Sequence, residues 1–155
     1  MHLIGYGNPG RGDDGLGPAF ATRMAERGLS GVTVSTDYQL TVDHALRIAE
    51  AGRVVFVDAL MRSDAPFRFA AVRPAPTHDL SSHSLSPAAV LALAATLYDA
   101  HPEAYVLGIS GVEFGEVKEG LSAKAERNLT LAEGAFLQWL ENSDCAKDIW
   151  GYAHA

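Results

Sequence analysis

Cysteine, basic residues and long apolar stretches are all scarce in this chain of 155 residues. Its single cysteine, Cys145, excludes an internal disulfide and any metal or cluster site built from several cysteines. The longest apolar stretch, residues 88–97, is interrupted by Thr96. It is also shorter than the about 20 residues that a membrane-spanning helix needs. The N-terminus shows no basic segment followed by a cleavable apolar region. These absences predict a soluble, cytoplasmic protein with no membrane partner.

Positive charge is also in short supply, since 12 Lys and Arg face 19 Asp and Glu, which gives a net charge of −7. Binding to nucleic acid phosphates needs clustered Lys and Arg, so no nucleic acid partner is expected. The length suits one domain, over residues 1–143, followed by a tail over residues 144–155. Nothing in the sequence specifies an oligomeric state.

Apolar runs alternate with segments of helical period along the chain, which predicts an α/β fold. We expect a three-layer sandwich, in which a mainly parallel, twisted sheet of five strands has helices on both faces. The expected strands are residues 2–6, 32–35, 54–58, 67–72 and 105–109. The connection from Asp58 to Phe67 is too short for a crossover helix, so the fourth strand is expected to pair antiparallel.

Four helices are expected between and after these strands. The first covers residues 16–27, and the second covers residues 41–51 with Thr41 as its N-cap and Val42 and Leu46 on its apolar face. Ser86 and Pro87 have the residue types of a cap and a first helical position. The last helix is expected to begin near Ser122.

A glycine-rich loop follows the first strand, with the sequence GYGNPGRGDDGLG over residues 5–17. Ligands bind at the carboxyl ends of strands in open α/β sheets, so a site is expected here. The glycine spacing matches neither a dinucleotide fingerprint nor a Walker loop. Asp13 and Asp14 would also repel a phosphate at the start of the next helix. Two carboxylates suit a cation, or a simpler role as caps of that helix.

Two further residues are candidates for the same site. Asp58 ends the apolar run 54–57, where a charged residue faces a loop, although a plain turn residue would stand there too. His83 lies in a serine-rich segment before the third helix, and its simpler interpretation is a solvated loop histidine.

Taken together, these motifs resemble the hydrogenase maturation proteases, endopeptidases that remove a C-terminal extension from the large subunit of nickel–iron hydrogenases. The similarity spans most of the chain in the expected order. It is carried by Gly5-x-Gly7-Asn8, Gly12-Asp13-Asp14-Gly15-x-Gly17, Val57-Asp58-Ala59, Ser82-His83-Ser84-Leu85-Ser86, Gly108-Ile109 and Gly115-x5-Leu121-Ser122.

This resemblance implies that Asp14, Asp58 and His83 are the metal-contacting and catalytic residues, with His78 as the alternative histidine. The metal would be nickel supplied by the substrate, and the partner would be the hydrogenase large-subunit precursor. Asp13 would orient Asp14 or cap the helix. The segment 37–40 would have at most a role in contacting the substrate.

Two other functions fit parts of the sequence. Gly7-Asn8-Pro9-Gly10 also resembles the opening motif of peptidyl-tRNA hydrolases, but no histidine follows before His44. A maturation factor that holds nickel without cutting would use the same three residues as the protease. Cys145 has no base near it in sequence, so a nucleophilic role is not expected.

Overall fold

The computed structural model describes residues 1–61, 63–77 and 84–145. Its centre is a five-stranded sheet in the order β2-β1-β3-β5-β4. β4 pairs antiparallel with β5, and the other neighbours pair parallel. The strands are β1 (His2–Tyr6), β2 (Thr33–Asp37), β3 (Arg53–Leu60), β4 (Phe67–Ala71) and β5 (Glu103–Ser110).

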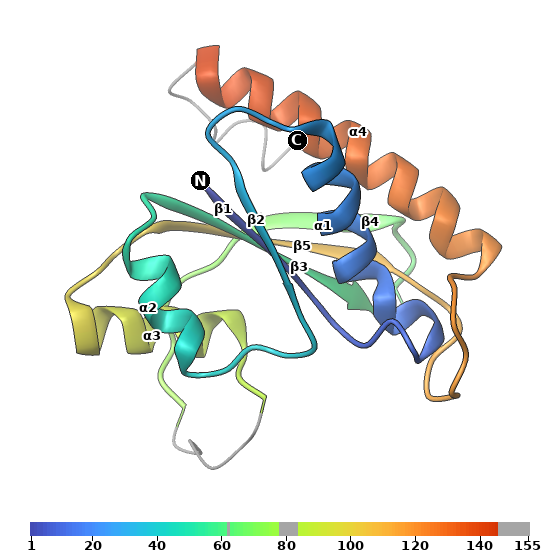
Figure 1. Ribbon diagram of the computed structural model, residues 1–155, viewed down its shortest axis with the longest axis horizontal. Helices are drawn as coiled ribbons and strands as arrows, with labels where there is room; N and C mark the ends of the chain where they lie inside the picture. The colour runs from blue at the N-terminus through green and yellow to red at the C-terminus, as the bar shows by residue number, and fades with distance from the viewer. Residues whose placement is uncertain (62, 78–83, 146–155) are drawn as a thin grey trace.

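Helices cover both faces of this sheet, with α1 and α4 on one side and α2 and α3 on the other (Figure 1). The helical elements are η1 (Gly12–Gly15), α1 (Leu16–Arg27), α2 (Asp43–Ala49), α3 (Pro87–Tyr98) and α4 (Ala123–Cys145). The predicted three-layer α/β fold is therefore confirmed, including the antiparallel fourth strand. No helix in the described ranges is long and apolar enough to cross a membrane.

The apolar run in β3 supplies both core clusters. Val54 and Phe56 pack with α2 and α3, whereas Val55 and Val57 pack with α1 and α4. All four are fully buried. Successive side chains of a strand point to opposite faces, so a strand covered on both sides reads as continuous apolar sequence.

Three of the helix boundaries follow from local chemistry. α1 ends before Gly28, which adopts a φ of 60° that an L-residue with a side chain rarely takes. The Ser86 hydroxyl accepts a hydrogen bond from the Ala89 N–H at 3.1 Å and caps α3, with Pro87 as its first residue. The Ser122 hydroxyl accepts from the Ala125 N–H in the same way at the start of α4.

The prediction for α2 was wrong in two respects. The helix is capped by Val42 rather than Thr41, without a side-chain hydrogen bond, and Val42 and Leu46 are half exposed. His44 is buried in their place. Its Nδ1 accepts from the Thr41 N–H at 3.0 Å, and its Nε2 lies 2.9 Å from the Asp37 carboxylate. Because both ring nitrogens have partners, the imidazole is buried at little cost.

Candidate active site

The glycine-rich loop brings the start of α1 into direct contact with the sheet. A methyl group on Gly17 would overlap the carbonyl oxygens of Tyr6 and Val57. Tyr6 is the last residue of β1, and Val57 lies in the second half of β3. A methyl group on Gly5 would overlap the Gly17 carbonyl oxygen. The glycines therefore allow backbone to pack on backbone, and they place η1, with its two aspartates, at the carboxyl edge of the sheet.

Asp13 is fully buried and joins three parts of the chain. One carboxylate oxygen accepts from the N–H groups of Val112 and Glu113 at 2.8 and 2.9 Å. Ser122 donates its N–H to the other oxygen and its hydroxyl to the first, both at 2.7 Å. Burial alone would raise the pKa of Asp13, but these hydrogen bonds together lower it.

Neither role considered for Asp13 in the sequence is the one observed. α1 has Gly15 as its N-cap and no side-chain capping bond, so Asp13 does not cap the helix that follows it. Its carboxylate contacts the loop after β5 and the start of α4 rather than Asp14. Asp13 is a structural residue that fixes the loop beside the site.

Asp14 has different partners from Asp13. One of its carboxylate oxygens accepts a hydrogen bond from the Asn8 N–H at 2.8 Å. It forms no ion pair with any residue that the structure describes. Asp14 thus has no cationic partner among the described residues.

Asp58 lies near the carboxyl end of β3, on the sheet face that Val54 and Phe56 share. Burial is the main reason that its pKa rises to about 6, and the negative charge of Asp14 raises it further. The Ala59 N–H, at 2.7 Å, and the Tyr6 hydroxyl donate to the carboxylate and oppose the rise. The structure therefore brings Asp14 and Asp58 close enough to repel each other.

Tyr6 is a site residue that the sequence argument missed. It is the last residue of β1, packs on the same core cluster as Val54 and Phe56, and donates its hydroxyl to Asp58. Burial and the neighbouring carboxylate raise the pKa of Tyr6 far above its ordinary value, so the hydroxyl stays protonated and remains a donor. A signal was available, because Tyr6 and Asp58 both end expected strands that lie side by side.

The histidine predicted for this site, His83, and its alternative, His78, lie outside the described residues. Within the described part of the chain, no group of three His, Cys, Asp or Glu side chains is arranged to hold a metal ion. The core residue that follows His83 most closely in the sequence is Leu85, which packs in the cluster that contains Val54 and Phe56. Its N–H donates to the Leu40 carbonyl at 3.0 Å.

No protein-family model matches the sequence, and no curated protein matches it at a significant level. Similarity in structure is extensive. The NiFe hydrogenase maturation protease HycI from Thermococcus kodakarensis matches with a TM-score of 0.64 and 25% identity. This match covers 85% of the present chain and 86% of the other. The chain has the fold of the hydrogenase maturation proteases.

Two more solved structures extend the similarity to this fold. The hydrogenase maturating endopeptidase HybD from E. coli has a TM-score of 0.69 at 18% identity, covering 92% of each chain. The endopeptidase HycI from Escherichia coli has a TM-score of 0.67 at 20% identity, covering 90% of each chain. The resemblance expected from the motifs is thus confirmed for the hydrogenase maturation protease fold as a whole.

Proposed function

We propose that this protein is an endopeptidase that removes the C-terminal extension of a nickel–iron hydrogenase large-subunit precursor after nickel insertion. One observation carries the proposal. Asp14 and Asp58 stand together at the carboxyl edge of the sheet, in a scaffold with the fold of the hydrogenase maturation proteases, and neither has a described cationic partner. Two mutually repelling carboxylates are stabilised when a cation binds between them.

In this proposal the cation is nickel that arrives already inserted in the substrate. Asp14 and Asp58 supply oxygen ligands and His83 supplies nitrogen, a mixed set that suits a divalent transition metal and leaves positions free for the substrate's own ligands. Leu85 supports the assignment of His83. It is packed on the face that carries Asp58 and comes two positions after His83, so at most about 7 Å of extended chain separates the two Cα atoms.

The protein's own groups set the charge state for binding. With a pKa of about 6, Asp58 is largely ionised near neutral pH but takes up a proton in mild acid. The Tyr6 hydroxyl fixes the carboxylate by a hydrogen bond and favours its ionised form. Asn8 fixes Asp14 through its backbone N–H. Both carboxylates are therefore oriented before the substrate binds, which lowers the entropic cost of binding.

Held in this way, the substrate's nickel would position the scissile peptide and either polarise its carbonyl group or activate a water molecule. The reaction would take place in the cytoplasm, a reducing compartment that suits a chain with one cysteine.

The test is to incubate the protein with nickel-loaded and metal-free precursor and to follow loss of the C-terminal extension by mass spectrometry. Cleavage of the nickel-loaded form only is expected. Asp14→Asn and Asp58→Asn should abolish it while the protein stays folded, and Asp64→Asn, an exposed control, should have no effect. Equal cleavage of both precursors would overturn the dependence on nickel. Nickel binding without any cleavage would identify a non-catalytic maturation factor instead.

A further inference from the structure

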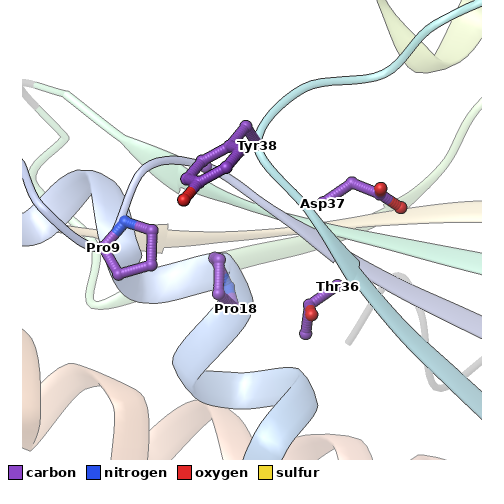
Figure 2. A pocket seen from close by; sticks show the side chains of 6 residues that line it. Pro9, Pro18, Thr36, Asp37 and Tyr38 are labelled. Carbon is purple, nitrogen blue, oxygen red and sulfur yellow. The ribbon is translucent and has the colours of Figure 1, made fainter.

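A cleft of about 320 Å³ opens between the glycine-rich loop, the start of α1 and the end of β2. Its volume is at the lower end of the range for ligand sites, about 300–1,000 Å³. Figure 2 shows the Tyr38 ring beside Pro9, with Pro18 on α1 below them. The lining residues are Gly7, Pro9, Pro18, Thr36, Asp37 and Tyr38.

Tyr38 is the most exposed aromatic residue in the described part of the chain, with an exposed fraction of 73%. The residue before it, Asp37, is nevertheless held through both its backbone and its side chain. The Gly7 N–H donates to the Asp37 carbonyl at 3.0 Å. His44 and Arg47 bind the Asp37 carboxylate at 2.9 and 3.0 Å. An exposed aromatic ring on fixed backbone loses little conformational entropy when a ligand covers it.

Three of the residues that line the cleft present rings, one aromatic and two of proline. Among the described residues Asp37 is the one acidic residue that lines it, and its carboxylate is already bound by His44 and Arg47. Figure 2 shows that the Asp37 side chain points away from Tyr38. The cleft therefore offers apolar contact rather than a free charge, and it suits an apolar side chain.

The cleft also adjoins the pair of carboxylates. Asn8 lies between Gly7 and Pro9, which both line the cleft, and its N–H binds the Asp14 carboxylate. Gly7 packs directly against the Asp14 carbonyl, since a side chain there would overlap it. One extended residue spans about 3.5 Å, so a polypeptide held at Asp14 reaches the cleft within a few residues.

We propose that Tyr38, Pro9 and Pro18 form a subsite for an apolar side chain of the substrate polypeptide, within a few residues of the cleaved bond. This inference rests on the proposed function, because it takes the occupant of the cleft and the ligand of the carboxylates to be one molecule. Tyr38 contributes to binding and specificity, and it takes no part in breaking the peptide bond.

The first experiment measures cleavage of nickel-loaded precursor by Tyr38→Ala, Tyr38→Phe and Tyr98→Ala. Tyr38→Ala should raise KM about tenfold or more with little change in kcat, because it removes the ring but no reacting group. Tyr38→Phe should behave like the unchanged protein, since the ring supplies the contact. Tyr98, a half-exposed tyrosine at the end of α3, is the matched control and should show no change.

The second experiment locates the side chain that fills the subsite. Aspartate is placed in turn at each precursor residue near the cleaved bond. At one position it should raise KM about tenfold for the unchanged protein but much less for Tyr38→Ala. Such non-additivity shows that the two residues are in contact. An unchanged KM for Tyr38→Ala, or the absence of any coupled position, would overturn the subsite.

Binding of the precursor, measured by calorimetry, separates failure of the subsite from failure of the proposed function. If the unchanged protein cleaves nothing, the proposed protease function is wrong. The subsite then stands only if the precursor still binds and Tyr38→Ala weakens that binding about tenfold. Absence of any binding would overturn both.

Discussion

Asp13 and Ser122 are joined by two hydrogen bonds of 2.7 Å, from the Ser122 N–H and hydroxyl to the two oxygens of one carboxylate. The Ser122 hydroxyl also accepts from the Ala125 N–H at the start of α4. Asp13 thus orients the capping residue of a helix more than a hundred positions away. It also fixes the loop after β5 through Val112 and Glu113. Its neighbour Asp14 has the opposite character, with a carboxylate held by one backbone N–H.

Asp13→Asn should destabilise the fold strongly. Asparagine has one acceptor oxygen for four donors, and hydrogen bonds to a charged group are each worth about 1.5–3 kcal/mol. We expect the free energy of unfolding to fall by about 3 kcal/mol or more in urea titrations, followed by fluorescence of the buried Trp139.

The pH dependence gives this prediction a second measurement. Because the pKa of Asp13 is lowered on folding, its stabilisation is complete above the ordinary value of about 4 and is lost as pH falls through the lowered pKa. Asp13→Asn should therefore lower the free energy of unfolding much less at about pH 2 than at pH 7. The structural role of Asp13 would be contradicted if the loss of unfolding free energy were the same at both pH values. A loss no greater than that of the exposed Asp64→Asn would contradict it too.

Gly17→Ala and Gly134→Ala should change stability in opposite directions, although both positions are in helices. At Gly17 the added methyl group overlaps backbone carbonyl oxygens of Tyr6 and Val57, so α1 must move off the sheet. We expect a loss of about 3 kcal/mol or more. Gly134 faces open space within α4, and alanine there should stabilise by about 0.5–1 kcal/mol. Thermal unfolding by circular dichroism measures both, and equal effects would contradict the close packing at Gly17.

Strong local patterns made much of this fold predictable from the sequence. The buried run 54–57, the Ser86-Pro87 start of α3 and the glycine after residue 27 each reflect a rule that acts within a few residues. The interior of α2 was not predictable in this way. Periodicity counts apolar side chains, and it cannot foresee that His44 is buried because Thr41 and Asp37 satisfy its ring.

The same distinction between local and distant contacts applies to the candidate site. Asp14 and Asp58 were candidates because one lies in the loop after an expected strand and the other ends an expected strand, and parallel strands bring their carboxyl ends to one edge. The choice of Asp14 rather than Asp13 came from the resemblance to the hydrogenase maturation proteases. The role of Asp13 was not, because its partners lie about a hundred residues away. The cleft beside Tyr38 was also beyond the sequence, since three separate segments form it.

Asp58→Asn should stabilise the protein at neutral pH. An aspartate whose pKa rises from 3.8 to about 6 on folding costs roughly 3 kcal/mol of unfolding free energy once it is ionised. The cost is absent below about pH 4, grows as pH rises through about 6 and is then constant. The asparagine side chain retains an oxygen that can accept from Tyr6 or Ala59. Urea titrations should show a gain of about 1–3 kcal/mol at pH 8 that disappears at pH 4.

The expected loss of cleavage by the same variant, together with its gain in stability, would mark Asp58 as a residue kept for function at the expense of the fold. Asp64→Asn, which removes an exposed carboxylate, should change neither quantity. Asp58→Asn could also prove less stable than the unchanged protein at pH 8. The Asp58 carboxylate would then be stabilised by further partners, and the conclusion that its charge is not neutralised would be wrong.

Tyr6→Phe and Asp14→Asn should move the pKa of Asp58 in opposite directions. Phenylalanine lacks the hydroxyl that favours the ionised carboxylate, so Tyr6→Phe should raise the pKa above about 6. Asp14→Asn removes a repelling negative charge, so the pKa should fall. Titration of the Asp58 carboxyl carbon by NMR measures both shifts. In the proposed function nickel binds ionised Asp58, so Tyr6→Phe should also slow cleavage more at about pH 6.5 than at about pH 8.5. Shifts of the same sign in the two variants would exclude the arrangement in which Tyr6 and Asp14 act on Asp58 in opposite senses.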